Sequence, residues 1–301
     1  MNKPLQQTVA ALALCLTLTG AAGASAAEPR LYADSALVQR GRISVEVIGH
    51  GPDLILIPGL ASSRETWRAT TARLKDRYRL HLVQVNGFAG APVGENASGA
   101  VLVPVAEAID AYIKQQRLAP ATVIAHSMGG TIVLWLAENH PETLKRALVV
   151  DALPFFAMVM AGPGATVEQA RAIGEPMRAS TTPMPAAART RMVAAMVTGA
   201  QDRLMVEKWS GDSDPSVVAR AMADDIELDL RPGLSAIHTP ITLLYPDNAP
   251  VGAPAGAMDR MYGAAFAAAG SIKPVRIDNS EHFIMLDQPA AYDRAVDAFL
   301  R

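Results

Sequence analysis

Short runs of β-branched and aliphatic residues alternate along this chain with longer segments of helical character. The candidate strands are Ile43–Ile48, Leu54–Ile57, His81–Val85, Thr122–Ala125, Ala147–Val150, Ile241–Tyr245 and Pro274–Ile277. The candidate helices are Arg64–Asp76, Val103–Gln116, Met128–Asn139 and Pro289–Leu300. Several of these strands are apolar throughout, as strands buried on both faces are, whereas Ile43–Ile48 alternates and is expected to be a half-exposed edge strand. The pattern predicts an α/β fold with a mostly parallel sheet covered by helices.

The alternation is interrupted between residues 153 and 230. This stretch is rich in Ala, Met, Pro and charged helix formers and shows no convincing strand. We expect it to be a helical lid inserted into an α/β core that comprises residues 28–152 and 231–301. Its methionines suit helix packing and, where they face the site, a substrate with an apolar part. No repeat of fixed period and no low-complexity linker divides the chain, which favours a single α/β domain carrying this lid.

The first 27 residues have the pattern of a secretory signal peptide. Lys3 precedes an apolar run over residues 9–18, and a small-residue stretch ending in Ala24-Ser25-Ala26 follows. We therefore expect a periplasmic or secreted protein. The single cysteine, Cys15, lies in this leader, so the mature chain would carry no thiol. No later segment approaches about 18 uninterrupted apolar residues, so no stable membrane insertion is expected after the leader is removed.

Composition narrows the possible partners of the protein. Half of the 301 residues are apolar, and the formal net charge is -2, so there is no basic field to attract nucleic acid. No HExxH string occurs, and the histidines lack metal-ligand spacing. Gly49-His50-Gly51 resembles the start of a dinucleotide fingerprint, but Leu54 stands at its third glycine, and no P-loop pattern is present. We expect neither a metal nor a cofactor, and the sequence gives no indication of the oligomeric state.

A strand that leads into a serine and then directly into a helix is the strongest chemical signal in the chain. The segment Thr122–Gly130 reads TVIAHSMGG, with Ser127 at the junction. A nucleophile elbow needs small residues two positions before and two positions after the serine, because strand and helix approach closely there. Ala125 and Gly129 occupy those positions. Ser127 is therefore the candidate nucleophile.

A serine nucleophile needs a base to take its proton and an acid to orient that base. His282 follows the last predicted strand and precedes the C-terminal helix, which places it at the carboxyl edge of the sheet. Asp247, just after the strand Ile241–Tyr245, is the first choice for the acid. Asp151 also follows a predicted strand and is the alternative, although a structural role as a strand-end carboxylate is also open for it.

Such a reaction also needs donors for the oxyanion of the tetrahedral intermediate. The early strand that ends at Ile57 leads into the turn Pro58-Gly59 and then Leu60. We expect the backbone N–H groups of Leu60 and Met128 to form the oxyanion hole.

With these motifs the chain resembles the α/β-hydrolase family from about residue 45 to its C-terminus, and residues 153–230 match the variable insertion where the family carries its lid. The resemblance places Ser127 on the nucleophile, Leu60 and Met128 on the oxyanion positions, and His282 in the histidine loop. The chain departs from the family in two places. Ala125 stands where the family has glycine, and Ala249 stands where the family often has its acid.

The expected activity is that of a serine hydrolase acting on a small, moderately apolar carboxylic ester through an acyl-enzyme. A lactonase, an amidase or peptidase, or a carbon–carbon hydrolase would use the same triad, so these alternatives stay open. Ser127 argues against dehalogenases and epoxide hydrolases, which use a carboxylate nucleophile. A protein that keeps this fold but only binds a ligand is the alternative from another functional class.

Overall fold

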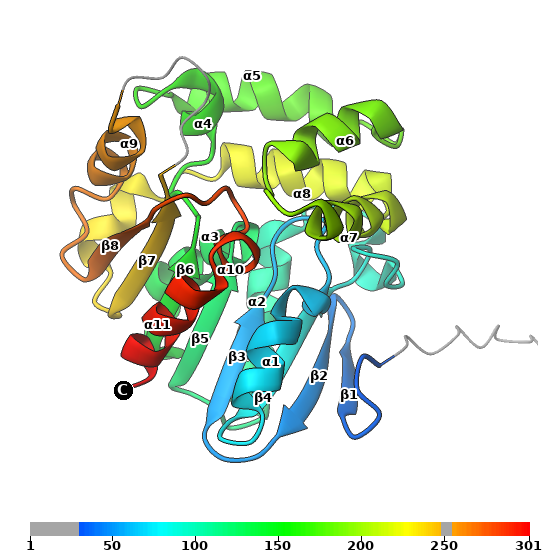
Figure 1. Cartoon of the computed structure of the whole chain (residues 1–301). Coiled ribbons are helices and arrows are strands. Elements are labelled where there is room, and N and C mark those ends of the chain that lie inside the picture. Colours follow the sequence, from blue (N-terminus) through cyan, green and yellow to red (C-terminus); the bar gives the residue numbers. More distant parts are fainter. Residues whose placement is uncertain (1–29, 248–254) are drawn as a thin grey trace, which may run out of the picture.

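The computed structural model describes residues 30–247 and 255–301, and the predicted leader, residues 1–27, lies outside this range. Its centre is an eight-stranded sheet in the order β1-β2-β4-β3-β5-β6-β7-β8 (Figure 1). The strands are β1 Ala36–Arg40, β2 Ile43–Gly49, β3 Asp53–Ile57, β4 Arg79–Val85, β5 Ala121–His126, β6 Leu144–Val150, β7 Ile241–Pro246 and β8 Ile272–Ile277. The β1–β2 and β2–β4 pairs are antiparallel, and all other pairs are parallel. This arrangement confirms the predicted mostly parallel sheet.

Helices cover both faces of the sheet. The helices outside the insertion are α1 Arg68–Leu74, α2 Leu102–Gln115, α3 Met128–Asn139, α9 Ala257–Ala265, α10 Ile284–Asp287 and α11 Pro289–Leu300. Successive side chains of a strand point to opposite faces, so Leu54 and Leu56 pack with α1 and α11 while Ile55 and Ile57 pack with α2 and α3. Burial on both faces explains why the central strands read as continuous apolar runs.

The alternating segment Ile43–Ile48 is not the edge strand that its pattern predicts. It forms β2, which pairs with β1 on one side and with β4 on the other, so the unforeseen strand β1 is the edge. The polar residues that produce the alternation are buried: Glu46 is fully inaccessible and accepts hydrogen bonds from the backbone N–H groups of Leu31 and Tyr32. The chain before β1 covers this face, and its N–H groups satisfy the carboxylate that the sequence seemed to expose.

Between β6 and β7 the chain forms only helices, as predicted for the insertion. They are α4 Ala157–Ala161, α5 Val167–Arg178, α6 Ala186–Ala194, α7 Ala200–Asp212 and α8 Pro215–Glu227, and they lie beyond the carboxyl edge of the sheet (Figure 1). We call α4 to α8 the cap. Helix α8 places Val217, Ala221 and Ile226 in the same apolar core as α2 and α3, so it joins the cap to the body. Across residues 30–247 and 255–301, every helix is too short or too polar to cross a membrane.

Candidate active site

The junction between β5 and α3 has the backbone conformation of a nucleophile elbow. Ser127 has φ 53° and ψ −127°, a conformation that non-glycine residues rarely adopt. Its N–H donates to Val150 O at 2.9 Å, which fixes the turn against β6. A Cβ atom at Gly129 would come within 2.7 Å of the Ile57 and Pro58 carbonyl oxygens, so a larger residue there would push the helix away from β3. Steric crowding therefore explains why the sequence pattern requires a small residue at position 129.

The loop after β3 lies against this elbow. A Cβ atom at Gly59 would come within 2.8 Å of Ser127 Cβ, which places Leu60, the next residue, beside the nucleophile. Met128 is the first residue of α3, where backbone N–H groups lack intrahelical partners. Among the described residues, the N–H groups of Leu60 and Met128 donate no hydrogen bond outside regular elements. Leu60 and Met128 therefore stay the predicted donors of an oxyanion hole.

His282 lies at the same edge of the sheet, paired with Asp151. The His282 Nδ1 to Asp151 Oδ2 distance is 2.6 Å, and the two side chains are 21% and 11% exposed. Asp151 directly follows β6, which neighbours β5, and has φ 51°. Its N–H donates to Leu244 O at 2.8 Å, which holds the strand end in place. A carboxylate on Nδ1 leaves Nε2 as the nitrogen available to act on a serine hydroxyl.

Asp247, the first choice for this acid, does not pair with His282. Its Oδ1 accepts a hydrogen bond from Asn279 N at 2.7 Å, three residues before the histidine. Asp247 directly follows β7, the strand next to the one that Asp151 follows, so both carboxylates come near the histidine loop from neighbouring strand ends. The structure thus assigns Asp247 to the support of the loop backbone and Asp151 to the imidazole. In this structure His282 thus pairs with Asp151, the alternative acid, and not with Asp247.

The loop that carries His282 is held on several sides. Asp287 Oδ2 accepts from Glu281 N at 2.8 Å, and Gln288 Nε2 donates to Asn279 O at 2.8 Å. Phe283 N donates to Met196 O of the cap at 3.1 Å. Backbone contacts on both sides of the histidine keep its ring in one position relative to Asp151.

His126, the residue before the candidate nucleophile, contacts the loop that carries His282. Its Nε2 lies 3.0 Å from His282 O, and its ring centroid is 4.5 Å from the His282 ring centroid. The pKa of His126 is held well below its ordinary value, mainly by burial and to a smaller extent by the nearby His282. A neutral imidazole can donate through Nε2 to the carbonyl, which makes His126 a support for His282 and not a base.

A second buried acid, Asp225 of the cap helix α8, faces the body of the protein. It is 5% exposed, and the Thr131 hydroxyl on α3 is within hydrogen-bonding reach. Its Oδ1 has no hydrogen-bond partner. Burial, with a smaller contribution from Asp224, raises the pKa of Asp225 to about 6. The folded protein therefore holds a proton on this carboxyl group at a pH where the unfolded chain has lost it.

We expect Asp225→Asn to remove a pH-dependent loss of stability. Because the pKa of Asp225 is raised in the folded state, its cost is absent below the ordinary value, grows as the pH rises from that value to about 6, and is constant above it. The free energy of unfolding of the wild type should therefore fall relative to the variant by about 2 kcal/mol between pH 4 and pH 8. Urea unfolding at both pH values measures this difference. Glu175→Gln, on an exposed cap position, is the control, and an equal pH dependence of wild type and Asp225→Asn would contradict the prediction.

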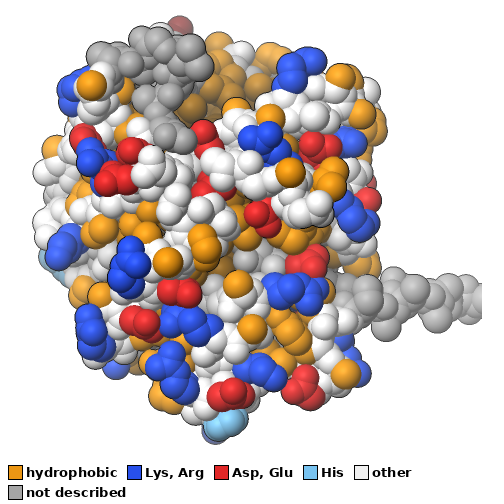
Figure 2. All heavy atoms as spheres, viewed as in Figure 1, with side chains coloured by type: hydrophobic (Ala, Val, Ile, Leu, Met, Phe, Trp, Pro, Cys, Tyr) orange, Lys and Arg blue, Asp and Glu red, His pale blue; other side chains and the backbone are white. Residues whose placement is uncertain are grey.

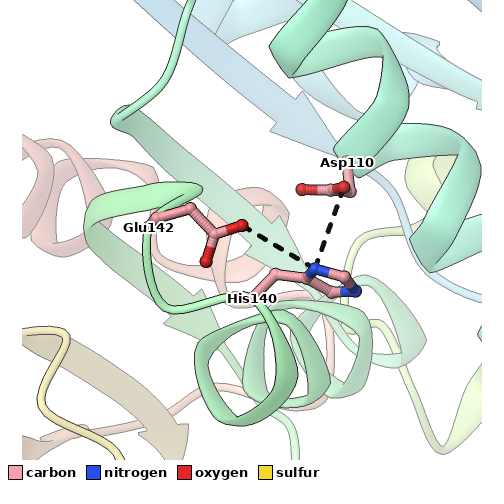
Figure 3. Close-up of side chains that lie close together, drawn as sticks. All are labelled: Asp110, His140 and Glu142. Atoms are coloured by element: carbon pink, nitrogen blue, oxygen red, sulfur yellow. Dashed lines mark ion pairs between the residues drawn. The ribbon is translucent and has the colours of Figure 1, made fainter.

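Acidic side chains and a histidine gather at the opposite edge of the sheet, where α2 and α3 end and β6 begins. Asp110, His140 and Glu142 are close enough together to suit a metal ion (Figure 3). However, Lys114 Nζ lies 2.9 Å from Asp110 Oδ2 and 2.7 Å from Glu142 Oε1, so an ammonium group already supplies the cation.

On the face drawn in Figure 2, basic and acidic side chains are interspersed without a continuous basic patch.

Comparison with known proteins places this chain in a family. The chain belongs to the alpha/beta hydrolase family, whose pattern it matches over residues 54–295. It is 33% identical over 114 residues to the pimeloyl-[acyl-carrier protein] methyl ester esterase of Aeromonas hydrophila, a match that spans 38% of this chain and 43% of that relative. The match therefore covers less than half the length of that relative.

A longer match involves a relative of the same description from Nitrosomonas europaea, 24% identical over 227 residues that make up 73% of this chain and 85% of that protein. Among solved structures, a thermophilic esterase from Thermogutta terrifontis superposes with a TM-score of 0.70 and 18% identity, covering 88% of this chain and 98% of that one. At this identity the superposition shows a shared fold. The protein is thus an alpha/beta hydrolase.

Proposed function

We propose that the protein is a serine hydrolase that cleaves carboxylic esters through an acyl-enzyme, with Ser127 as nucleophile, His282 as base and Asp151 as the acid that orients the base. The observation that carries this proposal is the 2.6 Å contact between His282 Nδ1 and Asp151 Oδ2 at the strand ends beside the strained Ser127. A serine and a histidine with only a structural role would require neither the strained backbone nor the paired carboxylate.

In the proposed first half-reaction, Ser127 Oγ attacks the ester carbonyl carbon while its proton passes to His282 Nε2. Asp151 stabilises the imidazolium that forms. The carbonyl oxygen becomes negatively charged, and the N–H groups of Leu60 and Met128 donate to it. The intermediate then collapses: the bond to the alkoxy oxygen breaks, His282 gives its proton to the leaving alcohol, and the acyl group stays on Ser127 Oγ.

The second half-reaction releases the acid. His282 takes a proton from water as the water oxygen attacks the acyl carbon, and the same two N–H groups hold the second oxyanion. Collapse of this intermediate breaks the bond to Ser127 Oγ, which regains its proton from His282. The products are a carboxylic acid and an alcohol, and the residues return to their starting protonation states.

The proposed substrates are small esters with an apolar part. Pimeloyl-[acyl-carrier protein] methyl ester esterases among the relatives support an ester bond, and the cap contributes the partly buried Met177 and Met222 to the apolar core. Lactones contain the same carbonyl chemistry, so hydrolysis of a lactone would use the same steps. The cap decides which of these substrates reaches Ser127.

A substrate panel tests the proposal. We expect hydrolysis of short p-nitrophenyl and methyl esters, with much lower rates on p-nitroanilides, because an amide carbonyl is less reactive and its amine is a poorer leaving group. The measurement is kcat/KM by absorbance and by pH-stat titration, with γ- and δ-lactones in the same series. A protein that hydrolyses none of these esters and lactones above the background rate would contradict the proposal.

A further inference from the structure

A tyrosine from α9 contacts the oxygen of Asp151 that the histidine leaves free. The Tyr262 hydroxyl donates a hydrogen bond to Asp151 Oδ1, while His282 Nδ1 lies 2.6 Å from Asp151 Oδ2. Each carboxylate oxygen therefore has its own donor, and the two donors come from α9 and from the loop after β8. The carboxyl plane is fixed from both sides.

The ring of Tyr262 is locked in place. It is 1% exposed, stacks on Tyr245 at 4.6 Å between centroids with an interplanar angle of 20°, and lies 6.5 Å from the Phe266 ring. Burial, with the nearby Asp151 charge, raises the pKa of Tyr262 well above its ordinary value. The hydroxyl thus keeps its proton throughout the working pH range and acts as a permanent donor to the carboxylate.

We propose that Tyr262 is a positioning residue of the active site: its hydroxyl holds the Asp151 carboxylate in the plane of the His282 ring and sets how strongly that carboxylate attracts the imidazolium. The inference rests on the proposed triad. It adds a residue that no motif in the sequence linked to the site.

The electrostatic consequence has a definite sign. A hydroxyl that donates to Asp151 withdraws part of its negative charge, so the carboxylate attracts the charged histidine less. Without the hydroxyl, the charge is concentrated toward His282, and a larger fraction of the imidazole carries a proton at a given pH. A protonated histidine cannot take the proton of Ser127, so activity should require a higher pH.

The experiment compares two variants that each remove one hydroxyl from the same pair of stacked rings. In Tyr262→Phe the donor to Asp151 is lost, whereas in Tyr245→Phe the hydroxyl lost is the one that donates to Asp259 Oδ1 at 2.9 Å. We expect Tyr262→Phe to lower kcat on p-nitrophenyl butyrate by about 10- to 100-fold and to move the acid limb of the kcat/KM profile to higher pH. Tyr245→Phe should leave the acid limb in place.

A readout without turnover separates this inference from the proposed function. In NMR titrations, the ring signals of His282 should titrate at a higher pH in Tyr262→Phe than in the wild type and in Tyr245→Phe, whether or not any ester is hydrolysed. Difluorotyrosine at position 262 keeps the ring and strengthens the donor, so it should shift the titration to lower pH, and it replaces the phenylalanine variant should that one fail to fold. Identical titrations in all these proteins, or an equal shift in Tyr245→Phe, would overturn the inference.

Discussion

Ser127→Ala is expected to lower kcat for ester hydrolysis by about 10⁶-fold, because the variant has no oxygen to form the acyl-enzyme. The backbone strain at position 127 does not depend on the hydroxyl, and alanine fits the same turn, so the fold should persist. Circular dichroism and thermal unfolding check the fold, and initial rates on p-nitrophenyl butyrate give the loss.

A fluorophosphonate probe provides a second measurement for the same substitution. The wild type should form a covalent adduct on Ser127 Oγ that mass spectrometry locates, and Ser127→Ala should not be labelled. Ser98→Ala, on an exposed turn, is the control and should label like the wild type. Equal labelling of Ser127→Ala and wild type would remove the nucleophile from the proposed mechanism.

Asp151→Asn and Asp247→Asn together decide which acid orients His282. We expect Asp151→Asn to lower kcat by about 10⁴-fold, since an amide neither stabilises the imidazolium nor holds the required tautomer. Asp247→Asn keeps a side-chain oxygen that can accept from Asn279 N, so its kcat should fall by less than about 10-fold.

Both variants are measured in the same p-nitrophenyl butyrate assay across pH, with KM recorded separately. A loss in kcat with little change in KM indicates an effect on the chemical step, whereas a shift of the loop would also change substrate binding. A larger loss for Asp247→Asn than for Asp151→Asn would restore the order that the sequence favoured.

The sequence was sufficient to predict the local backbone around Ser127. The small residues Gly59 and Gly129 lie in the short motifs that predicted them, although the crowding that requires them comes from the other segment at this junction. The acid depends on which of two neighbouring strand ends turns its carboxylate toward His282. The Asn279 N–H donates to Asp247, and the Tyr262 hydroxyl donates to Asp151. These two contacts determine which carboxylate faces His282. These are contacts between segments distant in sequence, and periodicity does not report them.

The edge of the sheet illustrates the same limit. The alternation in Ile43–Ile48 was real, but it reflected polar groups satisfied inside the protein and not a solvent-facing side. Glu46 is buried because Leu31 and Tyr32 donate to it, and those residues precede a strand, β1, whose apolar run is only the three residues Ala36–Val38. A pattern of polar and apolar residues shows which side chains of a strand are polar. Whether a polar side chain faces solvent or a partner inside the protein is decided by the tertiary fold.

The contacts between the cap and the histidine loop have a consequence for exchanging modules between relatives. Phe283 N binds Met196 O, and Asp287 accepts from both the N–H and the hydroxyl of Thr198 at 2.8 and 2.7 Å. A segment of the cap that contributes no proposed catalytic group is thus part of the frame around the proposed base. Chimaeras that replace the cap to change substrate preference would need to retain residues 196–198 or supply equivalent contacts.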